Sequence, residues 1–309
     1  MSEQIKIRRY KTSVREGNPF YTFVIYAFLI LFGLIAFYPF YYVIITSISP
    51  FRDFAANKTW FFPTGLILDN YIRVLRDPNL WNSYRNTVFL VVTITFFHIL
   101  SCVTIAYPLA MPKLIGRKFT VYFLLIPLFF NGGLIPSFLL IAKYLGLYKS
   151  YAAIILPVIT NITHLILTRS YFAASIPAEL RESAQIDGAN HYKILFQIYL
   201  PLAVPILAVL AIYCIVNVWN SWFSAALYIP ESSKHPLQLY LKRVLIDMSV
   251  IAATPPETLE ELEEFNKMVA ERTMMQYAMI VIAAAPILCI YPFLQKYFVK
   301  GIMVGSLKG

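Results

Sequence analysis

Residues 176–190 read IPAELRESAQIDGAN, and residues 198–201 read IYLP. This polar stretch lies between two long apolar runs, which favours two short helices outside a membrane. Pro177 suits the first turn of a helix, where its missing N–H costs nothing, and Glu179 and Glu182 lie near the positive end of that helix's dipole. We therefore expect an exposed surface on which another protein acts.

The second half of the stretch predicts a turn between the two helices. Gly188 is expected to end the first helix. Asn190 is a good N-cap for the second helix, and Pro201 is expected to end that helix and open the next apolar run. Together these residues predict a helix-turn-helix elbow over residues 176–201.

Composition independently indicates a membrane protein. Hydrophobic residues make up 59% of the chain and charged residues 14%, and the mean hydropathy is +0.65, which leaves too little polar surface for a soluble globular fold. A span across about 30 Å of hydrocarbon takes about 20 apolar residues. Runs of this kind cover residues 20–48, 88–111, 119–144, 151–172, 202–228 and 274–294. We therefore predict an all-α integral membrane protein with six spans.

Charge distribution predicts the orientation. With the N-terminus in the cytoplasm, 14 of the 26 Lys and Arg residues fall on the cytoplasmic side, packed into short segments near span ends, where the positive-inside rule applies. Both termini and the elbow are then cytoplasmic in a multi-pass protein of the cell membrane. Residues 1–19 form a cytoplasmic N-terminal segment, residues 20–309 a single transmembrane domain, and residues 229–273 a large extracellular loop. The net charge of +10 follows from this distribution and implies no nucleic-acid partner.

The elbow also carries a family resemblance. Glu182-Ser183-Ala184, with Gly188 four residues after Ala184 and then Ile198-x-Leu200-Pro201, resembles the E-A-A-x-x-x-G signature of binding-protein-dependent ABC transporter permeases. The flanking Ile176-Pro177-x-Glu179-Leu180 and Ile186-Asp187-Gly188-Ala189 resemble the maltose-type carbohydrate uptake family, in particular the permeases of Gram-positive oligosaccharide systems. Ser183 replaces the first alanine, a small-for-small change that still permits close helix approach.

The resemblance implies an ABC type I importer permease fold and a non-enzymatic permease subunit of an ATP-driven importer of an oligosaccharide. The implied partners are a second homologous permease subunit, two copies of a cytoplasmic ATPase, an extracellular lipid-anchored solute-binding protein and membrane lipid. ATP and Mg²⁺ would be bound by the partner ATPase, so no cofactor or metal is expected in this chain, which carries no G-x-x-x-x-G-K-[ST] motif. The contact with the ATPase is expected at Glu179, Glu182, Ser183, Ala184, Asp187 and Gly188.

A break in the third apolar run is one candidate for the sugar path. Asn131, Gly132 and Gly133 lie shortly before Pro136, and this combination interrupts a helix. Broken helices in transporters often line the substrate path, because irregular backbone needs protein or water around it. A simple kink or an early exit from the membrane explains the same residues equally well.

The end of the fifth apolar run is the other candidate for the sugar path. Asn217, Trp219, Asn220 and Trp222 combine indole faces, which stack on the C–H faces of sugars, with amides that bridge hydroxyl groups. Tryptophans also gather at the membrane interface as an aromatic belt. Both interpretations stay open on the residues alone.

An ion-coupled secondary transporter is the alternative function. His98 and His164 lie in predicted spans, where polar groups are costly and often functional. The predicted spans contain no Asp or Glu to partner them, so hydrogen bonding between helices is the favoured interpretation. The spans also do not divide into two similar halves, which disfavours an inverted-repeat transporter. Cys102, Cys214 and Cys289 lie in separate runs without a CxxC motif and are expected to be packing residues.

Overall fold

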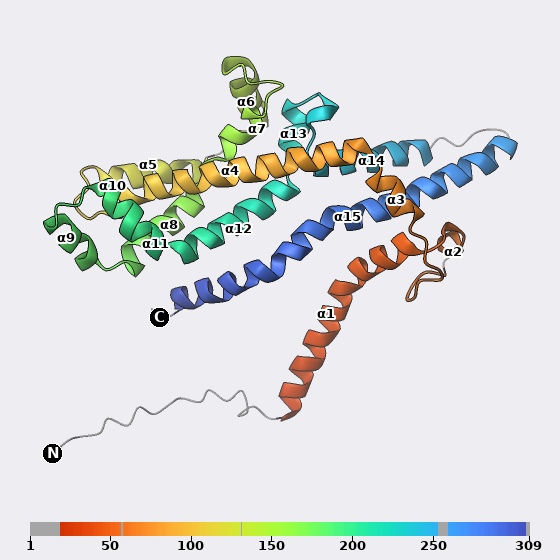
Figure 1. Ribbon diagram of the computed structural model, residues 1–309, viewed down its shortest axis with the longest axis horizontal. Helices are drawn as coiled ribbons and strands as arrows, with labels where there is room; N and C mark the ends of the chain where they lie inside the picture. The colour runs from red at the N-terminus through yellow and green to blue at the C-terminus, as the bar shows by residue number, and fades with distance from the viewer. Residues whose placement is uncertain (1–18, 57, 131, 253–258, 307–309) are drawn as a thin grey trace. The chain divides into compact units, whose positions relative to one another are not determined.

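The computed structural model describes residues 19–56, 58–130, 132–252 and 259–306, and the side chains of 248–252, 259–260 and 291–306 are not part of that description. Every regular element in the described part of the chain is helical. The chain divides into two compact units, residues 1–67 and residues 68–309. Figure 1 labels the helices and colours the chain from red at the N-terminus to blue at the C-terminus.

The first unit consists of one long apolar helix and a folded-back segment. Helix α1 (Pro19–Ile48) is followed by the short α2 (Phe51–Ala55). The segment after α2 returns to α1, since Tyr41 Oη donates a hydrogen bond to the carbonyl of Phe61 at 2.6 Å. The most apolar window of α1 has none of its residues buried within the chain. Apolar side chains on a helix whose backbone is internally bonded are what a membrane environment requires.

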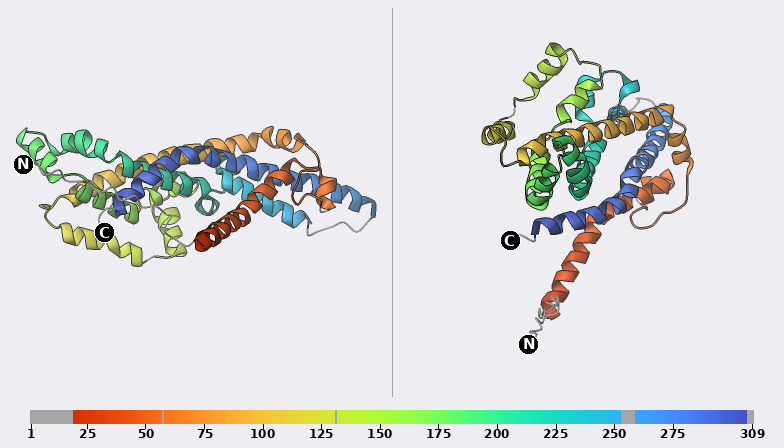
Figure 2. Two further views of the ribbon diagram at one scale, coloured as in Figure 1. Left: turned by 90° about the horizontal axis from the view of Figure 1, so that it is seen from below. Right: turned by 60° about the vertical axis from the view of Figure 1, so that its left-hand side comes forward.

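The second unit is built around α4 (Pro78–Ala110). Helices α8 (Ile162–Ser175) and α12 (Val204–Asn220) pack along α4, and α15 (Leu259–Ser306) packs against α12, α14 (Leu237–Ala252) and α3 (Asp69–Leu75). Figures 1 and 2 show α4, α12 and α15 running alongside one another.

The remaining apolar runs are broken helices. The third run forms α5 (Arg117–Phe129), α6 (Leu134–Leu139) and the π-helical turn η2 (Leu140–Tyr144). The fourth run forms α7 (Ala152–Ile155), η3 (Leu156–Val158) and α8, with a bend of 43° before α8. In the described part of the chain, three helices could span a membrane alone by length and composition, and up to six spans result if each bent pair counts as one. The predicted interruption near Gly133, which has φ +84°, is confirmed.

The prediction that Pro201 ends a helix is wrong. Pro201 lies inside the short α11 (Leu200–Leu202), and the 76° bend before α12 follows at Ala203. The preceding turn, η4 (Leu195–Tyr199), is π-helical, and Pro201 comes within the first two residues of the new α-helical turn. A proline is tolerated there because its missing N–H is not needed by the first turn.

The segment predicted as an extracellular loop is largely helical. It follows α13 (Phe223–Tyr228) and contains η5 (Ser232–Lys234), α14 and the start of α15. Leu237, Leu239 and Leu241 are buried, so α14 contributes to the core of this unit. The last predicted span, residues 274–294, is only the apolar part of α15. Hydropathy locates the part of a helix suited to lipid and not the points where the helix begins and ends.

Candidate functional site

Glu182, Ser183 and Ala184 of the signature lie on α9 (Ala178–Ile186), which ends in a Schellman motif at Gly188. The backbone N–H of Gly188 donates to the carbonyl of Gln185 at 3.1 Å, and that of Ala189 donates to the carbonyl of Ala184 at 2.9 Å. Gly188 has φ +75°, where a side chain on an L-residue costs roughly 1–2 kcal/mol. The predicted stop at Gly188 is therefore confirmed, and its physical reason is the left-handed backbone.

The helix after this turn is α10 (His191–Ile194), and Asn190 caps it. The side-chain oxygen of Asn190 accepts a hydrogen bond from the backbone N–H of Lys193 at 2.8 Å. This confirms the predicted N-cap. We call residues 177–199 the α9–α10 segment; it comprises α9, the Gly188 turn, α10 and η4.

One face of the α9–α10 segment is exposed, and it is both acidic and apolar. The exposed acidic residues are Glu179, Glu182 and Asp187, and Ser183 is exposed beside them. Large apolar side chains on the same segment are exposed as well: Leu180, Ile186, Tyr192 and Phe196. Ile186 is 88% exposed, although an apolar side chain of this size normally gains from burial. Exposed apolar groups rimmed by charges are typical of protein interaction sites.

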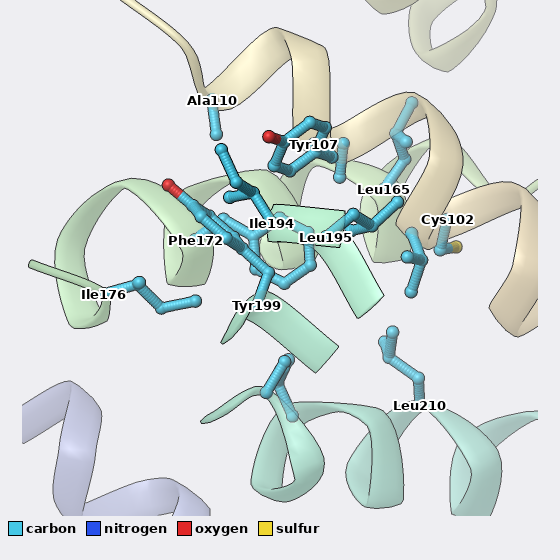
Figure 3. Close-up of a cluster of buried hydrophobic side chains, with 14 residues drawn as sticks. Cys102, Tyr107, Ala110, Leu165, Phe172, Ile176, Ile194, Leu195, Tyr199 and Leu210 are labelled. Atoms are coloured by element: carbon cyan, nitrogen blue, oxygen red, sulfur yellow. The ribbon is translucent and has the colours of Figure 1, made fainter. Parts of the chain in front are cut away.

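The other face of the segment is anchored in a buried apolar cluster, shown in Figure 3. Ile194, Leu195 and Tyr199 from α10 and η4 are buried against α4 and α8, and Ala184 and Ala189 pack at the edge of the same cluster. The ring of Tyr199 meets those of Tyr107 and Phe172 edge-on, with centroids 5.0 and 5.3 Å apart. The α9–α10 segment is therefore packed directly against α4 and α8.

Polar contacts of Arg181 and His191 with the end of α4 reinforce this anchor. Arg181 Nη1 lies 3.2 Å from the sulfur of Met111, at the end of α4, and its Nη2 lies 3.2 Å from a carboxylate oxygen of Glu182. The Arg181 side chain is only 12% exposed, whereas that of Glu182 is 63% exposed. Tyr107 Oη and His191 Nδ1 are 3.2 Å apart. The Glu182 carboxylate therefore extends outward from a guanidinium group that is itself largely shielded from solvent.

A second candidate site is a cavity of about 180 Å³ bounded by α4, α8, α12 and α13. Its described lining contains no Asp, Glu, Lys or Arg. The polar lining residues are His98, Thr160, Asn161, His164, Asn217, Ser221 and Ser224. Hydroxyl, amide and imidazole groups on an otherwise apolar wall suit a ligand rich in hydroxyl groups.

The two histidines in this cavity are hydrogen-bonded to each other. His98 Nε2 lies 2.9 Å from His164 Nδ1, and His98 Nδ1 lies 2.8 Å from the carbonyl oxygen of Ile159. Because the carbonyl of Ile159 can only accept, His98 Nδ1 carries the proton and donates to it. In neutral His98, Nε2 then accepts a hydrogen bond from His164 Nδ1. The Nε2 of neutral His164 is then a hydrogen-bond acceptor. The predicted bonding between helices is confirmed, and it fixes α4 to the break before α8.

The predicted sugar-path residues do not all meet at this cavity. Asn217 lines it, whereas Trp219 packs on the opposite side of α12 and donates from Nε1 to the carbonyl of Ala283 at 3.3 Å. Trp222 packs beside the cavity's apolar neighbours, and the Lys242 ammonium lies 2.9 Å from its ring centroid. Sugar contact at these residues stays a prediction.

The other predicted sugar-path residues lie apart from the cavity lining. Asn220 is exposed and donates from its side chain to the carbonyl of Val216, one turn earlier in α12. Gly132 and Gly133 are exposed at the break between α5 and α6, and Asn131 lies outside the described residues.

Sequence reasoning missed several residues of both sites. Arg181 and Tyr107 read as ordinary residues, yet they hold the α9–α10 segment on α4. Thr160 and Asn161 gave a weak signal, since Asn before an apolar run predicts an N-cap; the Asn161 side chain does accept from the His164 backbone N–H at 3.1 Å. Their position at the cavity follows only from the packing of α8 on α4.

Comparison with known proteins identifies relatives over nearly the whole chain. The chain is 38% identical over 277 residues to Protein LplC of Bacillus subtilis (strain 168), covering 90% of this chain and 91% of that protein. It is 36% identical over 299 residues to the polygalacturonan/rhamnogalacturonan transport system permease protein YtcP of the same organism, covering 94% and 99%. No family model matches the chain.

A solved structure gives the same result at the level of the fold. A bacterial ABC transporter involved in the import of the acidic polysaccharide alginate contains a chain that superposes with a TM-score of 0.82 at 32% identity, over 91% of this chain and 97% of that one. The apolar helices and these relatives together define a multi-pass membrane protein of the ABC permease class. The chain belongs to the carbohydrate ABC transporter permeases, whose subunits are not themselves enzymes.

Proposed function

We propose that this chain is one of two homologous permease subunits of an ATP-driven importer that moves an oligosaccharide across the cell membrane. An extracellular, lipid-anchored solute-binding protein delivers the sugar, and two copies of a cytoplasmic ATPase bind ATP and Mg²⁺ and supply the energy. The observation that carries the proposal is the α9–α10 segment, which is exposed on one face and anchored in the core on the other. Both termini and this segment then lie in the cytoplasm.

The proposed coupling runs from the exposed face to the spans. Glu182, held outward by Arg181, meets a basic residue of the ATPase, and Ile186 packs against its apolar surface. Closure of the ATPase dimer moves the segment, and the buried residues of α10 and η4 carry the motion to α4 and α8. The bends of 43° and 76° before α8 and α12 are the places where the spans change shape between inward-facing and outward-facing states.

We further propose that the cavity between α4, α8, α12 and α13 is part of the sugar path. Asn217 and Ser221 offer donors and acceptors to sugar hydroxyls, and neutral His164 offers an acceptor at Nε2. The names of relatives include acidic polysaccharides. The described lining has no carboxylate to repel a uronate and no ammonium or guanidinium to attract one, so hydroxyl recognition is the chemistry this cavity supports.

The function is tested by the energy source of uptake. The complex, reconstituted in proteoliposomes with its binding protein, should take up labelled oligosaccharide only when ATP is enclosed with the ATPase. Dissipating proton and sodium gradients with ionophores should leave that uptake unchanged. Uptake that follows an ion gradient without ATP would instead establish an ion-coupled secondary transporter.

A further inference from the structure

A second cavity, of about 610 Å³, lies where α4 is connected to α5, with one wall from α8. Its lining is strongly basic, because Arg117 and Lys118 begin α5 and Arg169 enters from α8. No Asp or Glu is among its described lining residues. Phe119 and Tyr122, on the first turns of α5, complete the wall. We call this the α5 basic cavity.

Within the part of the chain that the structure describes, the three positive charges have no protein counter-ion. The ion pairs of the described residues involve Arg73, Arg181 and Lys234, and none involves a residue of the α5 basic cavity. Arg169 donates from Nε to the carbonyl of Leu109 at 3.0 Å, which directs the guanidinium without neutralising it. Like charges gathered in one cavity repel each other unless an anion joins them.

The start of α5 adds to the positive potential. Gly116 occupies the N-cap with φ +75°, and no side chain caps the helix. The first backbone N–H groups of a helix lack partners within it, and they form the positive end of the helix dipole. An anionic group in the cavity would therefore meet three cationic side chains and the amino end of a 13-residue helix.

An exposed apolar surface begins directly beside these charges. The side chains of Phe119, Tyr122, Phe123 and Ile126 follow one another along α5 and are 74%, 68%, 61% and 51% exposed. The rings of Phe119 and Phe123 are stacked, with centroids 6.3 Å apart. A ligand that fits both surfaces has an anionic head and a long apolar tail.

We propose that the α5 basic cavity binds the phosphate of an anionic phospholipid, whose acyl chains lie along the exposed aromatic face of α5. Basic pockets between membrane helices on the cytoplasmic side are suited to such headgroups. The assignment of the site to the inner leaflet rests on the proposed function and its orientation. The phosphate chemistry and the adjoining apolar face do not depend on that orientation.

Lipid retention tests this site. The purified importer complex is placed in nanodiscs containing equal amounts of phosphatidylglycerol and phosphatidylcholine, and the lipids that stay bound after transfer to a neutral detergent are counted by native mass spectrometry. The wild-type complex should retain phosphatidylglycerol preferentially. Each charge removed, in Arg117→Gln and Lys118→Gln, should lower that retention about fivefold, since a basic residue near an anionic surface contributes about 1 kcal/mol.

Matched variants make the result specific. Lys113→Gln removes the same charge from the same connection, but Lys113 does not line the cavity, so retention should be unchanged. Arg117→Lys and Lys118→Arg preserve the charges and should retain the lipid. Equal yields of assembled complex exclude misfolding as the cause of a loss.

Three outcomes would overturn the proposal. Equal retention of the two lipids, or equal loss in Lys113→Gln, shows that no specific lipid site exists. Displacement of phosphatidylglycerol by millimolar inorganic phosphate shows a free-phosphate site. Cross-linking of a cysteine at Lys118 to a partner subunit in place of lipid shows a protein interface. Failure of the proposed orientation would be recognised separately, by labelling of cysteines in intact cells, because nanodiscs expose both leaflets to the same lipids.

Discussion

Substitutions at Gly188 are expected to distinguish two reasons for a glycine at this position: the left-handed backbone of the turn and close contact with the ATPase. An added Cβ would find no heavy atom within 4 Å, so the only intrachain cost of Gly188→Ala is the left-handed backbone at φ +75°. That cost is roughly 1–2 kcal/mol for an ordinary residue and smaller for asparagine, which visits this conformation routinely. Gly188→Val, with a β-branched side chain, should cost more than alanine.

The Schellman motif provides the measurement. The N–H groups of Gly188 and Ala189 are protected by bonds of 3.1 and 2.9 Å, and a destabilisation of 1–2 kcal/mol should speed their hydrogen exchange by roughly 5- to 30-fold in Gly188→Ala. Gly188→Asn should keep most of the protection. Exchange is measured by mass spectrometry on peptides covering residues 178–199 of the assembled complex.

Sugar uptake by the same variants completes the test. If the backbone alone matters, uptake should fall in the order of lost protection, with asparagine near wild type. If asparagine keeps protection but abolishes uptake, a side chain at position 188 blocks docking of the ATPase. Equal protection in the glycine, alanine and asparagine proteins would refute the strain argument.

Three further predictions follow from the proposed topology, the cavity and a buried histidine. In intact cells a cysteine at Gln185 should be shielded from impermeant thiol reagents while one at Glu261 reacts, and the reverse pattern would overturn the orientation. Asn217→Ala should raise the apparent KM for the sugar, whereas Trp219→Phe, which loses the bond to the Ala283 carbonyl, should cost about 1 kcal/mol of stability and leave KM unchanged; the opposite assignment of effects would show that Trp219 contacts the sugar. His235 is buried, and its Nε2 donates a hydrogen bond to the carbonyl of Ile229. Burial lowers the pKa of this imidazole, the hydrogen bond to Ile229 raises it, and the charge of Arg243 lowers it further. The folded-state pKa of His235 lies below the ordinary value of about 6.5, so the neutral imidazole stabilises the fold above about pH 6.5, and this stabilisation is lost as the pH falls through the folded-state pKa. Thermal unfolding measured between about pH 7.5 and about pH 5 should show this loss of stability, and His235→Gln should flatten the pH dependence.

Local chemistry was the predictable part of the fold. The glycine at position 188, the Asn190 cap and the break near Gly133 each depend on a few neighbouring residues, and all three are present. The prediction for Pro201 failed because a π-helical turn precedes it. That turn places Pro201 within the first two residues of α11 and not at the end of a helix. That turn has no marker in the residues themselves.

Long-range packing was the part that the sequence did not specify. Trp219 and Trp222 are only three residues apart, but α12 ends at Asn220, so Trp219 packs toward α15 and Trp222 toward the cavity side. The partner of Arg181, Met111, is 70 residues away along the chain. Such contacts depend on how helices cross, and periodicity alone does not determine that crossing.

The proposed coupling depends most on Glu182, which transmits force between the ATPase and the spans. The most direct test measures ATP hydrolysis and sugar uptake together in proteoliposomes containing wild type, Glu182→Gln or, as a control, Glu263→Gln, which alters an exposed glutamate on α15. We predict that Glu182→Gln assembles normally but loses most binding-protein-stimulated hydrolysis and uptake, while Glu263→Gln behaves as wild type. Wild-type hydrolysis and uptake in Glu182→Gln would contradict the account.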